Sequence, residues 1–105
     1  MAGDEVELAI VTMAFDAADL DRLIPILSKY VVVSRQQPGC RNIDFCASVT
    51  APGRLVIIQK WESAAAQRAH FDSPEMVEMA EMAKPLLTGP PVIDLLDGLS
   101  AHDLT

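Results

Sequence analysis

Two strand-like segments joined by a short turn constrain the fold of this chain more than any other feature. They occupy residues 37–61, QPGCRNIDFCASVTAPGRLVIIQKW. One Pro-Gly pair opens the first segment, a second pair closes it, and the next segment ends at Trp61 and Glu62. Pro-Gly pairs mark turns, and alternating apolar and polar side chains are typical of strands. The pattern predicts two adjacent strands that display an aromatic ring and a carboxylate at one end of a sheet.

Upstream of this pair, the sequence predicts a strand and then a helix. Residues 5–13 carry apolar side chains on both faces of an extended segment, as a covered central strand does. Asp16 offers a helix N-cap. The apolar residues that then recur at helical spacing are Leu20, Leu23, Ile24, Leu27 and Val31. Because Pro25 removes a backbone donor, we expect the helix to kink there or to start late.

Downstream, the two strands at 41–49 and 55–62 are followed by a helical region and a last strand. Residues 63–71 predict a short helix, and Ser73-Pro74-Glu75 is a strong start signal for a longer one. The apolar residues on one face of this second helix are Met76, Met79, Ala80, Ala83 and Leu87. A Gly-Pro break then leads to a strand at 92–96. The polar tail 100–105 is expected to be flexible.

The predicted order is β-α-β-β-α-β, the α+β ferredoxin-like arrangement with an antiparallel sheet. A length of 105 residues corresponds to one domain, 1–105. Half of the residues are hydrophobic, which exceeds what so small a core can bury. Helices would cover only one face of the sheet, so we expect a second copy to cover the other and form a homodimer.

The net charge of −7 excludes several kinds of partner. Eight basic residues scattered among fifteen acidic ones form no patch for a nucleic-acid backbone. The same charge disfavours anionic membranes, and no apolar run approaches the roughly 20 residues that a membrane span needs. The acidic N-terminus lacks the basic region of a secretory signal. We therefore expect a soluble cytoplasmic protein that binds neither nucleic acid nor membrane.

The two cysteines agree with a reducing compartment. Cys40 and Cys46 lie six residues apart on one predicted strand. At about 3.3 Å per residue their separation is roughly 20 Å, far beyond the ~7 Å limit for a disulfide. We expect two reduced, buried thiols, and neither has a histidine nearby in sequence that would make it a catalytic nucleophile.

Several short motifs recur here in a specific order across nearly the whole chain. They are Ser34-Arg35-Gln36-Gln37-Pro38-Gly39-Cys40, Pro52-Gly53-Arg54, Trp61-Glu62, the helix from Ala65 to His70, Ser73-Pro74 and Gly89-Pro90. No single piece is specific, but their order and spacing resemble the antibiotic-biosynthesis monooxygenase family, whose members are dimeric α+β barrels. The commoner family pattern has Glu where this chain has Gln37.

The resemblance implies a function. Such proteins often oxidise quinols, anthrones or related phenolic aromatics with molecular oxygen and no metal, flavin or haem cofactor. A phenol becomes an electron donor when it loses a proton, so the protein needs an apolar pocket, a proton acceptor and an aromatic side chain to orient the substrate. The expected partners are therefore a small aromatic substrate and O₂.

We assign candidate roles to six residues on this basis. His70 is the candidate proton acceptor, and Trp61 offers a stacking face and an N–H donor. Asn42 or Arg54 would stabilise developing oxyanion charge. The remaining two, Met76 and Met79, would line an adaptable substrate pocket.

Five of the six candidates also have a purely structural interpretation. A lone Trp in a small domain often simply packs in the core, and His70 is about as easily a structural residue as a catalytic one. Arg54 follows a turn and could only pair with a carboxylate. The methionines at helical spacing are commonly core residues.

Three other functions compete with oxidation of a quinol. Haem-degrading relatives hold iron through a histidine on the helix after the Ser-Pro break, where this chain has Met79 and no histidine. Relatives with a similar Thr-Gly-Pro segment are isomerases of sugar-derived dicarbonyls, which would want a more polar pocket. The third alternative is a non-catalytic small-molecule-binding dimer.

Overall fold

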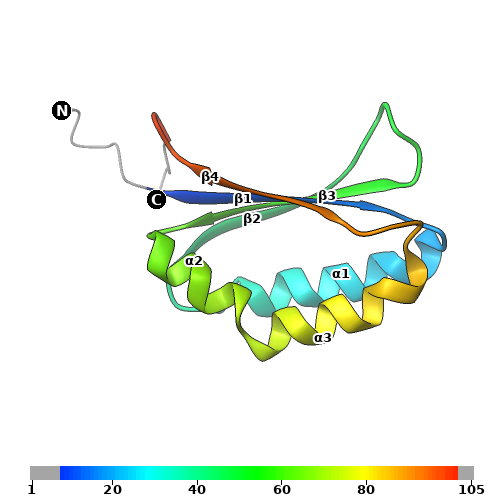
Figure 1. The fold of residues 1–105 in the computed structure, drawn as a ribbon, viewed down its shortest axis with the longest axis horizontal. Helices are drawn as coiled ribbons and strands as arrows, with labels where there is room; N and C mark the ends of the chain where they lie inside the picture. The colour runs from blue at the N-terminus through cyan, green and yellow to red at the C-terminus, as the bar shows by residue number, and fades with distance from the viewer. Residues whose placement is uncertain (1–7, 102–105) are drawn as a thin grey trace.

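The computed structural model describes residues 8–101, which form an antiparallel sheet covered by helices (Figure 1). The strands are β1 (Ala9–Asp16), β2 (Cys40–Ala47), β3 (Arg54–Trp61) and β4 (Val92–Asp97). The helices are α1 (Leu20–Ser34), α2 (Ala64–Phe71) and α3 (Pro74–Ala83), and a short 3-10 helix, η1 (Lys84–Leu86), follows α3. The expected start of the first strand at residues 5–7 lies outside the described residues, as does most of the tail, 102–105.

The strand order in the sheet is β2-β3-β1-β4, and all neighbours are antiparallel. β1 is central, because it pairs with β3 on one side and with β4 on the other. This arrangement confirms the predicted ferredoxin-like fold. The second helical region is divided into α2 and α3, each with its own N-cap serine.

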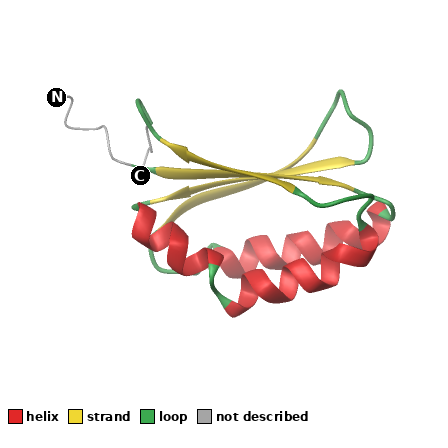
Figure 2. Ribbon diagram, in the orientation of Figure 1, coloured by secondary structure: helices red, strands yellow, loops and turns green. Residues whose placement is uncertain are grey.

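The helices lie on one face of the sheet and leave the other face bare, as Figures 1 and 2 show. Alternate strand side chains point toward the helices. On β1 and β3 these buried residues are Val11, Met13, Phe15, Leu55, Ile57, Gln59 and Trp61. The helices pack Leu23, Leu27, Tyr30, Val31, Met76, Met79 and Ala83 against them. The bare face of these two strands presents the half-buried residues Ile10, Thr12, Ala14, Val56 and Ile58.

The start of α1 differs from the prediction. Asp19, not Asp16, is the N-cap, and its side chain accepts a hydrogen bond from the Arg22 backbone N at 3.2 Å. Asp16 instead ends β1. Pro25 lies inside α1, one turn beyond this start, where it leaves the Asp21 carbonyl without an intrahelical donor. The helix therefore begins before Pro25, and the start delayed by this proline is not observed.

The two predicted Pro-Gly turns are confirmed. Gly39 and Gly53 both have φ of 82°, a left-handed conformation that glycine adopts without strain. At Gly39 space also matters, because a Cβ there would lie 2.5 Å from the Cβ of Ala66. The absence of a side chain therefore lets α2 pack against the turn before β2.

Two finer expectations are wrong. Both cysteines are free, as predicted, but neither is buried: Cys40 is half-buried, and Cys46 is exposed because it points to the bare face of the edge strand β2. Leu87 was placed on the last helix, yet α3 ends at Ala83 and continues as η1, which contains Pro85. Of the helices in the described part of the chain, none is long and apolar enough to cross a membrane.

Candidate functional site

An apolar pocket of about 430 Å³ lies between α3 and the helix-facing side of the sheet. Its walls are Met13 and Phe15 of β1, Ile93 of β4, Met76, Met79, Ala80 and Ala83 of α3, and Lys84, Leu87, Thr88, Gly89, Pro90 and Pro91 of the segment between α3 and β4. Among the described residues that line it, Lys84 alone is charged and Thr88 alone carries a hydroxyl. Such a lining suits a small, flat, apolar ligand with few polar groups.

The start of α3 fixes the methionine wall of this pocket. Ser73 is the N-cap, and its hydroxyl accepts a hydrogen bond from the Met76 backbone N at 3.3 Å. Pro74 at the first helical position has a backbone angle that already suits a helix. With the helix phase set in this way, Met76, Met79 and Ala83 fall on one face and turn toward the sheet.

A chain of buried hydrogen bonds runs through the adjoining core. The indole Nε1 of Trp61 donates to Gln59 Oε1 at 2.9 Å, and Gln59 Nε2 donates to the hydroxyl of Tyr30 at 2.8 Å. Tyr30 Oη lies 2.7 Å from Nε2 of His70. The imidazole of His70 in turn stacks on the Trp61 ring, with centroids 4.6 Å apart and planes 24° from parallel. None of the four residues is more than 4% exposed.

This chain meets the pocket at Met76. The Tyr30 hydroxyl lies 3.5 Å from the Met76 sulfur, and Met76 is a wall of the pocket. Tyr30 and His70 are not themselves among the pocket walls. A single flexible thioether therefore separates the apolar pocket from the only buried tyrosine and histidine among residues 8–101.

Burial sets the charge state of both groups. It lowers the pKa of His70, an effect that the nearby Glu75 carboxylate partly opposes. Burial also raises the pKa of Tyr30, and the hydrogen bond from Gln59 partly opposes that shift. Both side chains are therefore neutral near pH 7, which leaves His70 able to accept a proton. Its Nδ1 is buried and has no hydrogen-bond partner within the described part of the chain.

The structure brings together four of the six predicted site residues. His70 and Trp61 are in contact, and Met76 and Met79 both line the pocket. The expectation that Trp61 is displayed at the end of the sheet is wrong, because its side chain is 0% exposed. One face of the indole is covered by His70, and its N–H is taken by Gln59.

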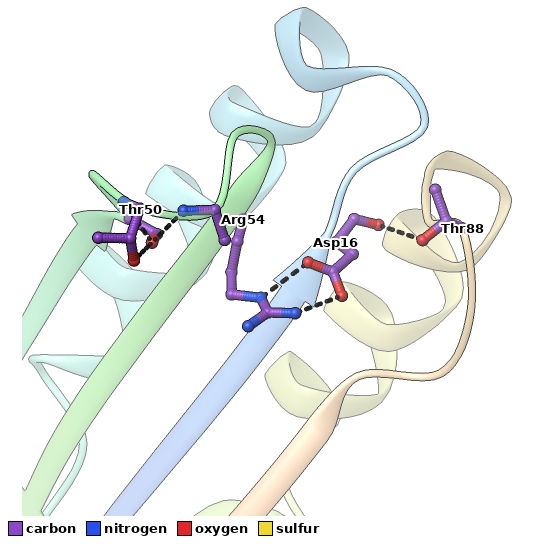
Figure 3. A network of polar contacts seen from close by, with 6 residues as sticks. Asp16, Thr50, Arg54 and Thr88 are labelled. Carbon is purple, nitrogen blue, oxygen red and sulfur yellow. Dashed lines mark hydrogen bonds and ion pairs between the residues drawn. The ribbon is translucent and has the colours of Figure 1, made fainter.

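Asn42 and Arg54 lie elsewhere, on the bare side of the sheet. Arg54 on β3 donates from Nε and Nη2 to the carboxylate of Asp16 on β1, at 2.9 and 3.2 Å (Figure 3). These bonds lower the pKa of Asp16 and raise that of Arg54. Asn42 is exposed and donates to Asp44 at 3.1 Å. A substrate contact for Asn42 or Arg54 would therefore require a ligand on the bare face.

Sequence reasoning missed Tyr30 and Gln59, although both carried a signal. Gln59 occupies an inward position of β3, in alternation with Ile57 and Trp61, and a polar residue at a core position needs a hydrogen-bond partner. Tyr30 is the only tyrosine, and it lies three residues beyond Leu27 on the apolar stripe of α1. The sequence could not predict that these two side chains meet, because they are 29 residues apart in the chain.

No group of three or more His, Cys, Asp or Glu side chains within residues 8–101 is arranged to hold a metal ion. The polar groups of Tyr30 and His70 adjoin the pocket, and Lys84 and Thr88 lie on the pocket wall itself.

Comparison with known proteins agrees with this fold. The family model for antibiotic biosynthesis monooxygenase matches residues 8–82. No curated protein matches the chain.

Solved structures give close matches in fold. A candidate antibiotic biosynthesis monooxygenase from Deinococcus radiodurans has a TM-score of 0.82 at 20% identity, over 92% of this chain and 98% of that one. One from Caulobacter crescentus has a TM-score of 0.80 at 18% identity, over 90% and 92%. Rv0793 from Mycobacterium tuberculosis has a TM-score of 0.79 at 25% identity, over 90% and 97%. Because the family match spans most of its length, the chain belongs to the antibiotic biosynthesis monooxygenase family.

Proposed function

We propose that this protein is a cofactor-independent monooxygenase that oxidises a quinol, an anthrone or a similar phenolic aromatic with molecular oxygen. The observation that carries the proposal is the apolar pocket, separated from the buried Tyr30–His70 pair by one methionine side chain. Family membership supports the reaction class.

The pocket suits the proposed substrate in size and in chemistry. Ligand pockets typically enclose about 300–1,000 Å³, so this one is large enough for a small aromatic ring system. Met76 and Met79 present flexible, polarisable thioethers that adapt to a flat ring. Lys84 supplies positive charge on the pocket wall, which would favour a ligand that becomes an anion.

His70 is the proposed proton acceptor. Loss of a proton converts the phenol into an electron-rich anion that can reduce O₂. All four electrons then come from the substrate: one oxygen atom enters the ring system, and the other leaves as water. No external reductant is needed. The protein's contribution is to hold the ring, receive the proton and keep bulk water away from the anion.

Oxygen uptake by metal-free and flavin-free protein tests this function. The substrates are a panel of quinols and anthrones, each with an autoxidation blank, and a chelator is present throughout. We expect uptake above the blank in the wild type and a large loss in His70→Gln. The exposed Gln36→Leu variant is the matched control and should keep full uptake. No uptake with any substrate would contradict the proposal and would favour the non-catalytic binding dimer.

We also propose that a second copy of the chain covers the bare face of the sheet. That face is apolar at its centre, with Val56 and Ile58 of β3 half-buried and Val92 and Leu96 of β4 62% and 46% exposed. Sheet-to-sheet packing would bury these side chains. Sedimentation of the wild type should show a dimer, and Ile58→Lys should shift it toward the monomer. A monomer at all concentrations in the wild type would contradict this proposal.

The free thiols of Cys40 and Cys46 favour a reducing compartment. We accordingly propose a cytoplasmic location, which fractionation of cells that produce the protein would test.

A further inference from the structure

The directions of the buried hydrogen bonds leave one lone pair of the Tyr30 hydroxyl oxygen without a hydrogen-bond donor. The indole N–H of Trp61 can only donate, so Gln59 must face it with Oε1 and must face Tyr30 with its NH₂ group. One lone pair of Tyr30 Oη is therefore occupied by a donor. The bond from Gln59 leaves the Tyr30 hydrogen free to point elsewhere.

The Tyr30 hydrogen has two acceptors within reach. His70 Nε2 lies at 2.7 Å and the Met76 sulfur at 3.5 Å. An unprotonated imidazole nitrogen is a much stronger acceptor than a thioether, so we assign the His70 tautomer in which the hydroxyl donates to Nε2. His70 then carries its own hydrogen on Nδ1, the atom without a partner among the described residues.

A second lone pair of Tyr30 Oη remains. The buried Ser34 hydroxyl lies close enough to lower the pKa of Tyr30 but forms no hydrogen bond of its own within the described residues. The side chain packed against the Tyr30 hydroxyl on the pocket side is that of Met76. A thioether has no hydrogen to donate. The Met76 thioether therefore covers this lone pair of Tyr30 Oη without donating a hydrogen bond to it. Methionine has an unbranched side chain with several rotatable bonds, so the sulfur can move at small cost.

We propose that Tyr30 is the residue that contacts the substrate hydroxyl, which displaces the Met76 thioether and donates to Tyr30 Oη. The Tyr30 hydroxyl lies against a pocket wall, 3.5 Å from the Met76 sulfur, whereas His70 stacks on Trp61 and lies behind that hydroxyl. Tyr30 therefore relays the proton. The substrate O–H bond breaks and a new Tyr30 O–H bond forms. The original Tyr30 hydrogen passes to His70 Nε2, which gives a phenolate, a neutral tyrosine and an imidazolium.

Binding of two dyes that are not oxygenase substrates tests the contact directly. The first, para-nitrophenol, carries a hydroxyl, and the second, para-nitroanisole, replaces it with a methyl ether. At a pH low enough to keep para-nitrophenol un-ionised, we expect the wild type to bind the phenol about two- to tenfold more tightly than the ether, the value of one hydrogen bond. Tyr30→Phe should abolish that preference while it binds the ether as the wild type does. Circular dichroism of each variant shows whether it is folded.

The role of Met76 has its own matched control. Met76→Ala removes the thioether over the hydroxyl and should increase the preference for the phenol. Met79→Ala enlarges the same pocket, but the Met79 sulfur is not the one that lies against the Tyr30 hydroxyl, so this variant should change the affinities of both dyes alike. Equal changes in the Met76 variant would overturn the displacement step.

The outcomes separate this inference from the proposed function on which it rests. A folded Tyr30→Phe protein that still prefers the phenol, or a wild type that binds neither dye or shows no preference, overturns the contact with Tyr30. A Tyr30-dependent preference without oxygen uptake from any quinol supports the contact and contradicts the monooxygenase. Oxygen uptake together with an unchanged preference for the phenol in Tyr30→Phe supports the monooxygenase and contradicts the contact with Tyr30.

Discussion

Replacement of Gln59 by leucine should destabilise the protein by about 2 kcal/mol. Gln59 is 2% exposed and bonds both Trp61 and Tyr30. Leucine has a similar volume but accepts no hydrogen bond, so the buried Trp61 N–H loses its acceptor, Gln59 Oε1, which costs about 1–3 kcal/mol. Tyr30 keeps its bond to His70 and loses a smaller contribution, about 0.5–1.5 kcal/mol. Removal of the amide from the core offsets part of this sum.

Urea unfolding followed by the fluorescence of Trp61, the only tryptophan, measures this loss. Protein concentration is held constant, because self-association would make the midpoint depend on it. Thermal unfolding should show a midpoint lower by about 8–16 °C, since 1 kcal/mol corresponds to about 4–8 °C in a domain near this size.

Two controls make the result interpretable. Gln36→Leu, the same change at an exposed position, should alter stability by no more than about 0.5 kcal/mol. The double variant Gln59→Leu/Tyr30→Phe should lose about 0.5–1.5 kcal/mol less than the sum of the single losses, because their shared bond is removed only once. Additive losses, or a Gln59→Leu variant as stable as the control, would refute the bonded chain.

Other predictions concern the turns, the ion pair and pH. Gly39→Ala should destabilise by at least about 1 kcal/mol through its positive φ and the clash with α2, whereas Gly89→Ala, where a Cβ meets nothing within 4 Å, should be nearly neutral in the same unfolding assay. Arg54→Met should return the Asp16 pKa, followed by NMR, toward that of an ordinary aspartate. Because the pKa of His70 is lowered by folding, its neutral form contributes stability above about pH 6.5 that is lost as pH falls through the folded-state pKa. Urea midpoints should therefore depend less on acidic pH in His70→Gln; an equal dependence would contradict burial of a neutral imidazole.

The fold was predictable because its signals are local. The Pro-Gly pairs marked turns that the structure confirms with positive φ at Gly39 and Gly53. Ser73 and Pro74 correctly predicted where α3 begins. The N-cap of α1 was misplaced because two aspartates, Asp16 and Asp19, precede the helix. Asp16 belongs to the strand through its pairing with Arg54 across the sheet, a contact that is distant in sequence.

The candidate site was predictable only in part because its geometry is not local. Met76 and Met79 follow from helix phase, so their shared face could be read from the sequence. The contact of Tyr30 with His70 joins α1 to α2 across 40 residues, and no spacing rule connects them. Arg54 was ambiguous for a different reason. Its position after a turn was compatible with either a substrate contact or an ion pair, and in the structure its side chain forms an ion pair with Asp16.

The buried chain has consequences for how the proposed mechanism can be examined. Trp61, Gln59, Tyr30 and His70 hold one another in the core, so removal of a whole ring would create a cavity as well as remove a proton carrier. Loss of activity in His70→Ala would then report on folding as much as on chemistry. Tyr30→Phe retains the ring and deletes only the hydroxyl that would meet the substrate. It is the substitution that best separates the proton path from the stability of the core, because its effect on a phenol and on the matching methyl ether should differ.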